Sequence, residues 1–231
     1  MTTVSSRIRP SVPGTAGAVT ALVVVAVVGL MHLVAPWNRH DPVRRTISEY
    51  AVGPGGWLFD VAVLGLVAAT VAVVVALHAR DLVTPTAIVL FAVWCVGLVL
   101  VVVFEKTNWS IGPSVSGSIH RYASLAAFVA LPAAGLLVAR AHRGARWATW
   151  VTVFSVLALA SFLPIIGAIA LNPVLATPWY RAVPLGLIER VLSLAEVMVV
   201  VVLGLGAVRS ASRGRSPRRS VPAPEATTTT G

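Results

Sequence analysis

The stretch Leu82–Phe104 reads LVTPTAIVLFAVWCVGLVLVVVF and contains no charged residue. Charged residues flank it on both sides, Asp81 before and Glu105 after. A helix that crosses about 30 Å of hydrocarbon needs roughly 20 apolar residues, because each residue adds about 1.5 Å. The stretch therefore predicts a transmembrane helix over residues 82–104.

The other long intervals between charged residues predict five more spans, so the fold class expected is an all-α, polytopic six-helix membrane bundle. The interval Trp147–Tyr180 is too long for one ordinary span and too short for two with a turn. We interpret it as one helix to about Leu171 with a kink at Pro164, followed by a loop that Asn172 and Pro173 open. The predicted helices cover residues 15–36, 57–79, 82–104, 119–140, 147–171 and 186–208.

Composition supports the membrane assignment. Hydrophobic residues make up 57% of the chain and charged residues only 11%, whereas a soluble domain has about 25% charged residues. This balance excludes a soluble enzyme, a secreted disulfide scaffold and a disordered regulator. The formal net charge is +10, but the basic residues lie in short loops and near the C-terminus, so we expect contact with the lipid bilayer and no nucleic-acid partner.

Basic residues also predict the orientation. Eleven Arg and Lys residues lie on the side of the predicted termini and seven on the other side, which places both termini in the cytoplasm. We expect a multi-pass protein of a bacterial cytoplasmic (plasma) membrane, because the Ala, Val and Arg bias is typical of a high-GC bacterial genome. Residues 1–14 are expected to form a cytoplasmic segment, and residues 209–231 a disordered basic tail.

Polar residues gather on the predicted outer side, in long loops and in the helix ends that follow them. Glu189, Ser193 and Glu196 have the spacing i, i+4, i+7 and so share one helix face. Charged groups in a membrane are costly unless they are paired or hydrated. We therefore predict an outward-facing polar cavity, lined by the first, second, fourth and sixth helices and roofed by the loop 37–56. Its candidate residues are Asp41, Arg44, Ser48, Glu49, Asp60, Glu105, His120, Arg121, Glu189, Arg190, Ser193 and Glu196.

Three functions fit this pattern. The first is binding or transport of a small polar solute, an ion or a lipid headgroup, with Glu196 exchanging a proton. The second is a structural or accessory role in an envelope complex, in which the polar groups only pair with one another; a membrane-protein partner or a homo-oligomer would fit it. The third is a hydrolase at the outer leaflet, for which Ser48, His120 and either Asp60 or Glu49 supply the residue types.

Neither a cofactor nor a metal is expected from the motifs. The chain has no G-x-S-x-G and no H-E-x-x-H sequence. His32, His40 and His120 are the only histidines on the predicted outer side and so the only weak metal candidates there. A haem held between His32 and His120 is a minor alternative.

Several motifs together resemble one family. The run His40–Tyr50 (HDPVRRTISEY), with the Gly53-Pro54 and Trp57–Asp60 (WLFD) that follow it, is similar to the first-loop signature of the bacterial membrane proteins grouped as domain of unknown function 998. Gly117–His120 (GSIH) and Gly186–Arg190 (GLIER) resemble that family's motifs at the starts of the fourth and last helices. The chain departs from the family after Phe104, where Glu105, Lys106 and Thr107 replace an expected proline and aspartate. The resemblance implies six helices and an outer polar cluster, but it implies no reaction.

Overall fold

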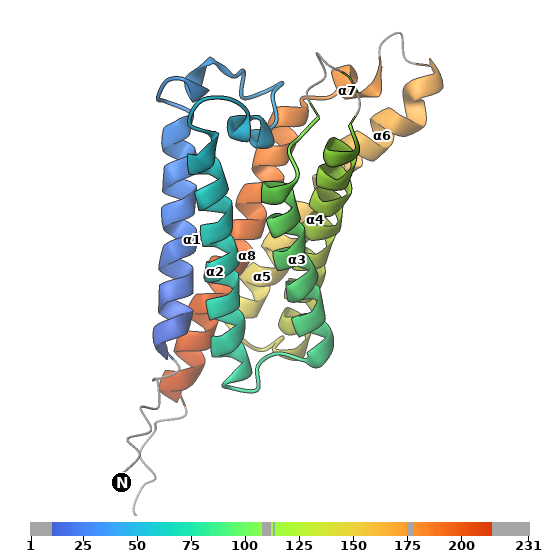
Figure 1. Cartoon of the computed structure of the whole chain (residues 1–231). Coiled ribbons are helices and arrows are strands. Elements are labelled where there is room, and N and C mark those ends of the chain that lie inside the picture. The colour runs from blue at the N-terminus through green and yellow to red at the C-terminus, as the bar shows by residue number, and fades with distance from the viewer. Residues whose placement is uncertain (1–10, 108–111, 113, 175–177, 214–231) are drawn as a thin grey trace, which may run out of the picture.

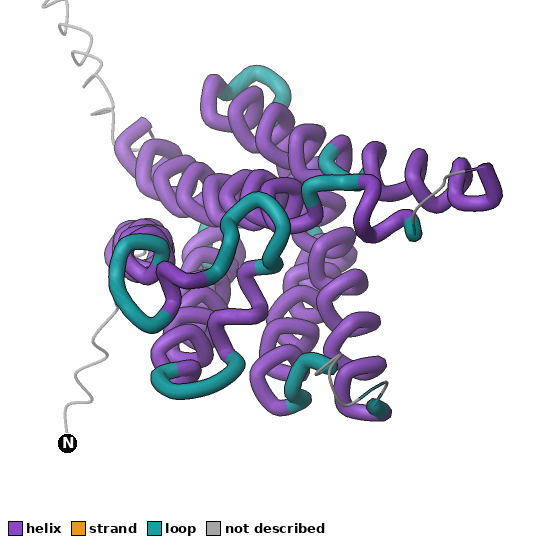
Figure 2. The backbone as a smooth tube through the Cα atoms, turned by 90° about the horizontal axis from the view of Figure 1, so that it is seen from above, coloured by secondary structure: helices purple, strands orange, loops and turns teal. Residues whose placement is uncertain are grey.

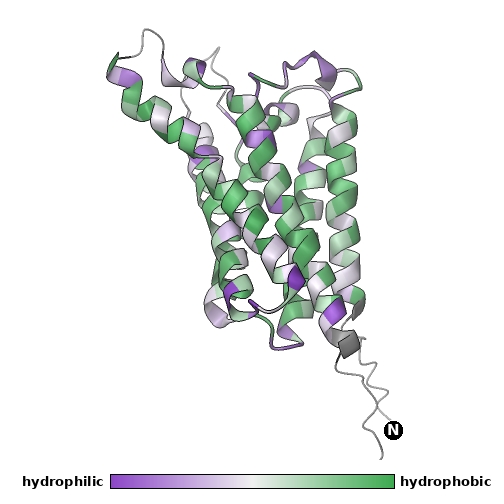
Figure 3. Cartoon of the chain, turned by 180° about the vertical axis from the view of Figure 1, so that it is seen from behind, coloured by the Kyte–Doolittle hydropathy of each residue, from purple (hydrophilic) through white to green (hydrophobic). Residues whose placement is uncertain are grey.

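The computed structural model describes residues 11–107, 112, 114–174 and 178–213. Six helices within these residues are long and apolar enough to cross a membrane, and the same residues contain no strand. The six spans run side by side as one bundle (Figure 1). Apolar residues cover the middle of the bundle, and hydrophilic residues gather toward its two ends (Figure 3). The predicted all-α membrane bundle is thus confirmed.

Most helix ends fall within a few residues of the predicted ones. The first helix stops at Met31, five residues before its predicted end, and the last helix continues five residues beyond residue 208. The long helices are α1 (Ser11–Met31), α2 (Gly56–His78), α3 (Pro85–Val103), α4 (Val115–Ala141), α5 (Arg146–Ala160), α6 (Leu163–Leu171) and α8 (Leu185–Arg213). Short helical turns lie at one end of the bundle: η1 (Trp37–Arg39), η2 (Ile47–Ala51), η3 (Asn172–Val174) and α7 (Trp179–Ala182).

The fifth span is broken close to the predicted kink. Ser161 and Phe162 form a turn between α5 and α6, and Pro164 lies in the first turn of α6. A proline is tolerated there because the first helical N–H groups have no partner within the helix. Viewed along the bundle, α6 extends outward beyond the other spans (Figure 2). Leu163 and Ile166 are 65% and 58% exposed, so the rest of the bundle does not cover these side chains of α6.

Small residues let neighbouring helices approach closely. At the crossing of α1 and α8, a Cβ atom added to Gly204 would lie 2.6 Å from the carbonyl oxygen of Gly14. Between α3 and α4, a Cβ atom added to Gly97 would lie 2.9 Å from the carbonyl oxygen of Ala123. Without a hydrophobic effect between helices in lipid, such close contacts are a main source of packing energy.

The two ends of the bundle differ. The start of α1 and the end of α8 lie together at one end, and the loop 32–55 covers the helices at the other end (Figure 1). We call the end covered by this loop the outer end. Residues 1–10 of the predicted cytoplasmic segment and 214–231 of the predicted tail lie outside the described residues. Which end faces the cytoplasm stays a prediction from the basic residues.

Candidate functional site

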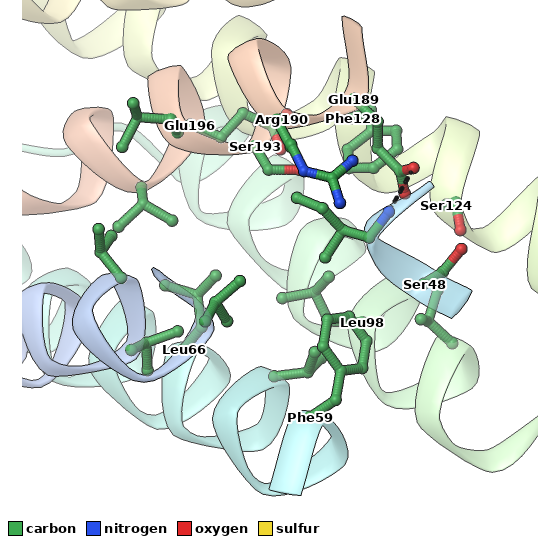
Figure 4. Close-up of a pocket in the computed structure, with 18 of the residues that line it drawn as sticks. Ser48, Phe59, Leu66, Leu98, Ser124, Phe128, Glu189, Arg190, Ser193 and Glu196 are labelled. Carbon is green, nitrogen blue, oxygen red and sulfur yellow. Dashed lines mark hydrogen bonds between the residues drawn. The ribbon is translucent and has the colours of Figure 1, made fainter. Parts of the chain in front are cut away.

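A cavity of about 280 Å³ lies in the outer half of the bundle. Its wall is formed by residues of α1, α2, α3, α4 and α8, and η2 contributes Ile47 and Ser48. The observed cavity differs from the predicted one in two ways. Helix α3 contributes to its wall, and its surface is mainly apolar, with Phe59, Leu66, Leu98 and Phe128 among the lining side chains (Figure 4). The polar lining residues are His32, Ser48, Ser124, Glu189, Arg190, Ser193 and Glu196.

Arg190 ties α8 to the outer loop. Its Nη1 donates hydrogen bonds to the carbonyl oxygens of Pro42 at 2.8 Å and Arg45 at 2.7 Å, and to that of Gly186 in its own helix at 3.0 Å. Its Nη2 donates to the hydroxyl of Tyr50 at 3.1 Å, and its guanidinium carbon lies 5.7 Å from the centre of that ring. The guanidinium of Arg190 therefore binds the loop at three positions, Pro42, Arg45 and Tyr50.

His32 completes this contact from the end of α1. Its Nε2 lies 2.7 Å from Nε of Arg190, and its Nδ1 lies 2.7 Å from the carbonyl oxygen of Val28. Because the guanidinium can only donate, Nε2 of His32 accepts, and the ring proton belongs on Nδ1, which donates to Val28. Both ring nitrogens are therefore used within the chain, which leaves neither of them for a metal ion or a haem iron.

Glu189 binds the same loop through its carboxylate. Oε2 accepts a hydrogen bond from the backbone N–H of Ile47 at 2.9 Å (Figure 4). Next to it, the backbone N–H of Leu187 donates to the carbonyl oxygen of Val43 at 3.1 Å. Glu189 can only accept and Arg190 can only donate hydrogen bonds. Together these neighbouring residues therefore bind both N–H and C=O groups of the loop backbone. We call the contacts of Glu189 and Arg190 with the loop, together with the contact between His32 and Arg190, the loop clamp.

A second polar cluster joins the loop 32–55 to Lys106, which follows the end of α3, and lies beside the cavity. The carboxylate of Glu49 lies 3.2 Å from Nζ of Lys106 and 3.2 Å from Nη1 of Arg45. It also accepts a hydrogen bond from the hydroxyl of Thr46, which Lys106 contacts as well. Burial raises the pKa of Glu49, but the charge and hydrogen bond of Lys106, with Arg45 and Thr46, outweigh burial and lower the pKa overall.

Other predicted site residues lie outside the cavity wall. Asp41 accepts a hydrogen bond from the N–H of Val43 at 2.8 Å within the loop, and Arg44 donates to the carbonyl oxygen of Arg181 at 3.0 Å. Arg121 is exposed and lies 5.5 Å from the ring centre of Tyr122. Five of the predicted residues do line the cavity, and seven do not. The five are Ser48, Glu189, Arg190, Ser193 and Glu196; the seven are Asp41, Arg44, Glu49, Asp60, Glu105, His120 and Arg121.

His120 is held at the end of α3. Its Nδ1 lies 2.9 Å from the carbonyl oxygen of Phe104 and 3.1 Å from that of Val101. Ser48 makes its side-chain contact with Thr46, at 3.2 Å. Among the described residues no hydrogen bond joins Ser48 to His120, so the serine–histidine pair that a hydrolase would need is not assembled.

The part of the chain that the structure describes holds no group of three or more His, Cys, Asp or Glu side chains suited to a metal ion. Of the weak metal candidates, His40 lies with Nδ1 3.1 Å from the carbonyl oxygen of Trp37. In His32 and His120, as in His40, Nδ1 lies within hydrogen-bond distance of a backbone carbonyl oxygen.

Glu196 differs from the other acids of the site. It lies in the cavity wall, its side chain is 0% exposed, and neither carboxyl oxygen has a hydrogen-bond partner among the described residues. Ser193, on the same face about one turn nearer the outer end, is half-buried, and no hydrogen bond of its hydroxyl is found within the described part of the chain. Ser48 and Ser124, which also lie outside the loop clamp, have hydrogen-bond partners in Thr46 and in the carbonyl oxygen of His120. Ser193 and Glu196 are thus the polar side chains of the cavity wall for which the described residues provide no hydrogen bond.

The sequence reasoning missed three contributors to this site. Tyr50 anchors the clamp, Lys106 pairs with Glu49, and Trp94 brings an aromatic ring to the cavity wall. Tyr50 could have been found, because it is the one aromatic residue in the charged run His40–Tyr50. Trp94 gave no such signal, since α3 is apolar on every side.

Comparison with known proteins gives one match. Residues 16–206 match the family described as "Protein of unknown function (DUF998)". No curated protein and no solved structure matches the chain.

Proposed function

The chain belongs to this family, and because membership names no activity, we propose from the geometry that the protein binds one amphiphilic, lipid-like molecule taken from the membrane. The observation that supports this proposal is the character of the cavity. Its wall is mainly apolar, while its unengaged polar groups, Ser193 and Glu196, lie along one helix. A small polar solute or a hydrated ion would gain little from such a wall, whereas an apolar chain with one polar group would match it.

Access from the membrane side also supports a lipid-like ligand. Gly29 of α1 and Leu194 of α8 both line the cavity, and both are exposed. Leu194 is 51% exposed, and no atom lies within 4 Å of a Cβ added to Gly29. The contact of His32 with Arg190 lies about one turn nearer the outer end on both helices, so Gly29 and Leu194 have similar depths. An apolar chain could therefore pass between α1 and α8.

The loop clamp gives the cavity a roof. Ile47 is bound to Glu189 through its backbone, and the neighbouring Ser48 lines the cavity. A roof fixed in this way favours a ligand that arrives sideways from lipid over one that arrives from water. The proposal also takes the outer end to face away from the cytoplasm, in a bacterial cytoplasmic membrane with both termini inside, as the basic residues predict.

The proposal is tested by native mass spectrometry of the purified protein in nanodiscs. We expect the wild-type protein to retain one lipid-like molecule, and Leu194→Trp, which fills the gap beside Gly29, to lower the occupancy at least tenfold. Leu187→Trp is the matched control, since Leu187 is 47% exposed on the same helix and does not line the cavity. Equal occupancy in the two tryptophan variants, or an empty wild-type protein, would refute the proposal.

A further inference from the structure

The unpartnered carboxyl of Glu196 restricts what the ligand can be. An ionised carboxylate without a hydrogen bond or counter-charge is very costly in an apolar environment. Neither carboxyl oxygen of Glu196 has a hydrogen-bond partner among the described residues, and the ion pairs of Glu49 with Arg45 and Lys106 do not involve it. Without a counter-charge, the carboxyl of Glu196 is therefore more stable as the neutral acid, whose hydrogen-bonding groups have no partner among the described residues.

No titratable group among the described residues forms a hydrogen bond with the carboxyl of Glu196. The other titratable groups of the cavity wall are His32, Glu189 and Arg190, and all three are engaged in the loop clamp. The residues that α2, α3 and α4 bring to the wall are apolar or carry hydroxyls. On the far side of α8, α5 has only one titratable residue, Arg146, at the opposite end of the bundle. A proton that leaves Glu196 must therefore go to water.

Aromatic rings complete the site. Phe59 of α2, Trp94 of α3 and Phe128 of α4 all line the cavity that Glu196 borders. The faces of aromatic rings attract cations, and the attraction is stronger where water is excluded. A carboxyl group among aromatic and aliphatic walls thus suits a molecule that carries one positive charge on an otherwise apolar body.

We propose that the ligand is a lipophilic amine, bound as its ammonium ion, and that Glu196 releases its proton when the ammonium ion binds. The inference rests on the proposed function, because it names the ligand class of the same cavity. The exchange is balanced: the ammonium ion keeps its protons, the carboxyl O–H bond of Glu196 breaks, and that proton passes to water. The carboxylate formed pairs with the ammonium ion, no covalent bond forms, and one proton leaves for each amine bound.

The test compares n-dodecylamine with 1-dodecanol, which have the same chain but different polar groups. Binding to the protein in nanodiscs is measured by titration calorimetry at about pH 7.5, where an alkylamine is charged. Repeating the titration in two buffers with different heats of protonation counts the protons released. We expect the wild-type protein to bind the amine at least tenfold more tightly than the alcohol and to release about one proton per amine.

Glu196→Gln keeps the shape of the side chain and removes its proton exchange. We expect this variant to bind the amine at least tenfold more weakly and to release no proton, with its affinity for the alcohol unchanged. Asp60→Asn is the matched control, because Asp60 does not line the cavity; it should bind both ligands as the wild-type protein does. If Glu196→Gln does not fold, the proton count of the wild-type protein still decides.

The outcomes separate the two proposals. Equal affinities for amine and alcohol, or no proton release by the wild-type protein, would overturn the amine inference. The lipid-like ligand would stand in that case if Leu194→Trp abolished the binding of the alcohol. If neither ligand bound to the wild-type protein, both proposals would fall.

Discussion

The loop clamp makes a quantitative prediction about Arg190. Three of its acceptors belong to the outer loop: the carbonyl oxygens of Pro42 and Arg45 and the hydroxyl of Tyr50. A hydrogen bond in a partly exposed setting contributes about 1 kcal/mol net. The clamp therefore favours the closed loop by roughly 3 kcal/mol through Arg190, if the three contributions are simply added. At about 1.4 kcal/mol for each factor of ten, Arg190→Met should raise the open fraction of the loop roughly 150-fold.

Trypsin can report this opening, because the loop contains its own cleavage site after Arg45. Where opening and closing are fast relative to cleavage, the cleavage rate follows the open fraction. We expect Arg190→Met to speed cleavage after Arg45 by about two orders of magnitude, as measured by mass spectrometry of the fragments. Arg190→Lys should lie between this variant and the wild-type protein, because one ammonium cannot reach the three acceptors that the planar guanidinium reaches.

The control for this prediction is Arg121→Met. Arg121 is exposed, and its side chain lies against Tyr122 rather than the loop, so its removal should leave the cleavage rate after Arg45 within about a factor of two of that of the wild-type protein. A cleavage rate in Arg190→Met that equals the wild-type rate, in a protein with unchanged helical circular dichroism, would refute the clamp.

Other predictions concern pH, packing and the histidine. Because the pKa of Glu49 is lowered from the usual 4.5, its ionised form stabilises the loop fully above about pH 4.5, and this contribution disappears as the pH falls through the lowered pKa. Hydrogen exchange of residues 46–51 should become faster over this pH range. In Glu49→Gln this pH dependence should be absent. Gly204→Val should lower the thermal stability by about 1–3 kcal/mol or more, because its side chain would collide with the backbone of Gly14, whereas Gly167→Val, which has open space around it, should differ little in a thermal-shift assay. His32→Phe leaves Nε of Arg190 without its acceptor and should speed tryptic cleavage after Arg45 by roughly 5- to 30-fold; an unchanged rate would show that His32 does not support the clamp.

The transmembrane spans could be predicted because charge-free length alone defines them. The predicted helix at 82–104 and the observed Pro85–Val103 differ only where local chemistry sets the ends. The hydroxyl of Thr84 accepts a hydrogen bond from the N–H of Ala87, and Pro85 occupies the first turn. The first helix was predicted too long, because apolar character continues past Met31 after the helix has ended. Hydrophobicity decides that a segment is buried in lipid, but capping decides where its helix stops.

The candidate site could be predicted only in part. The spacing of Glu189, Ser193 and Glu196 predicts that they share one helix face, and all three line the cavity. The partner of Glu189 could not be predicted, because it is a backbone N–H, that of Ile47, 142 residues away. Every residue except proline carries such a donor, so a backbone partner leaves no mark in the sequence. The prediction of a polar wall failed for a related reason, since uniformly apolar helices such as α3 do not show which side they turn inward.

Glu189 has a hydrogen-bond partner in the loop, whereas Glu196 has none among the described residues, and this difference follows from the depth of the two acids in the bundle. A loop carries N–H and C=O groups that need water or other partners, so it cannot enter the hydrocarbon region unless these groups are satisfied. It can reach Glu189 and Arg190, which lie in the first turns of α8, and its backbone there takes the place that an external ligand would take. Glu196 lies about 10 Å deeper along the same helix, beyond the reach of the loop. Because the described residues leave its carboxyl without a partner, this depth is the basis of the proposal that a lipophilic amine, which is apolar enough to enter the hydrocarbon region, pairs with Glu196.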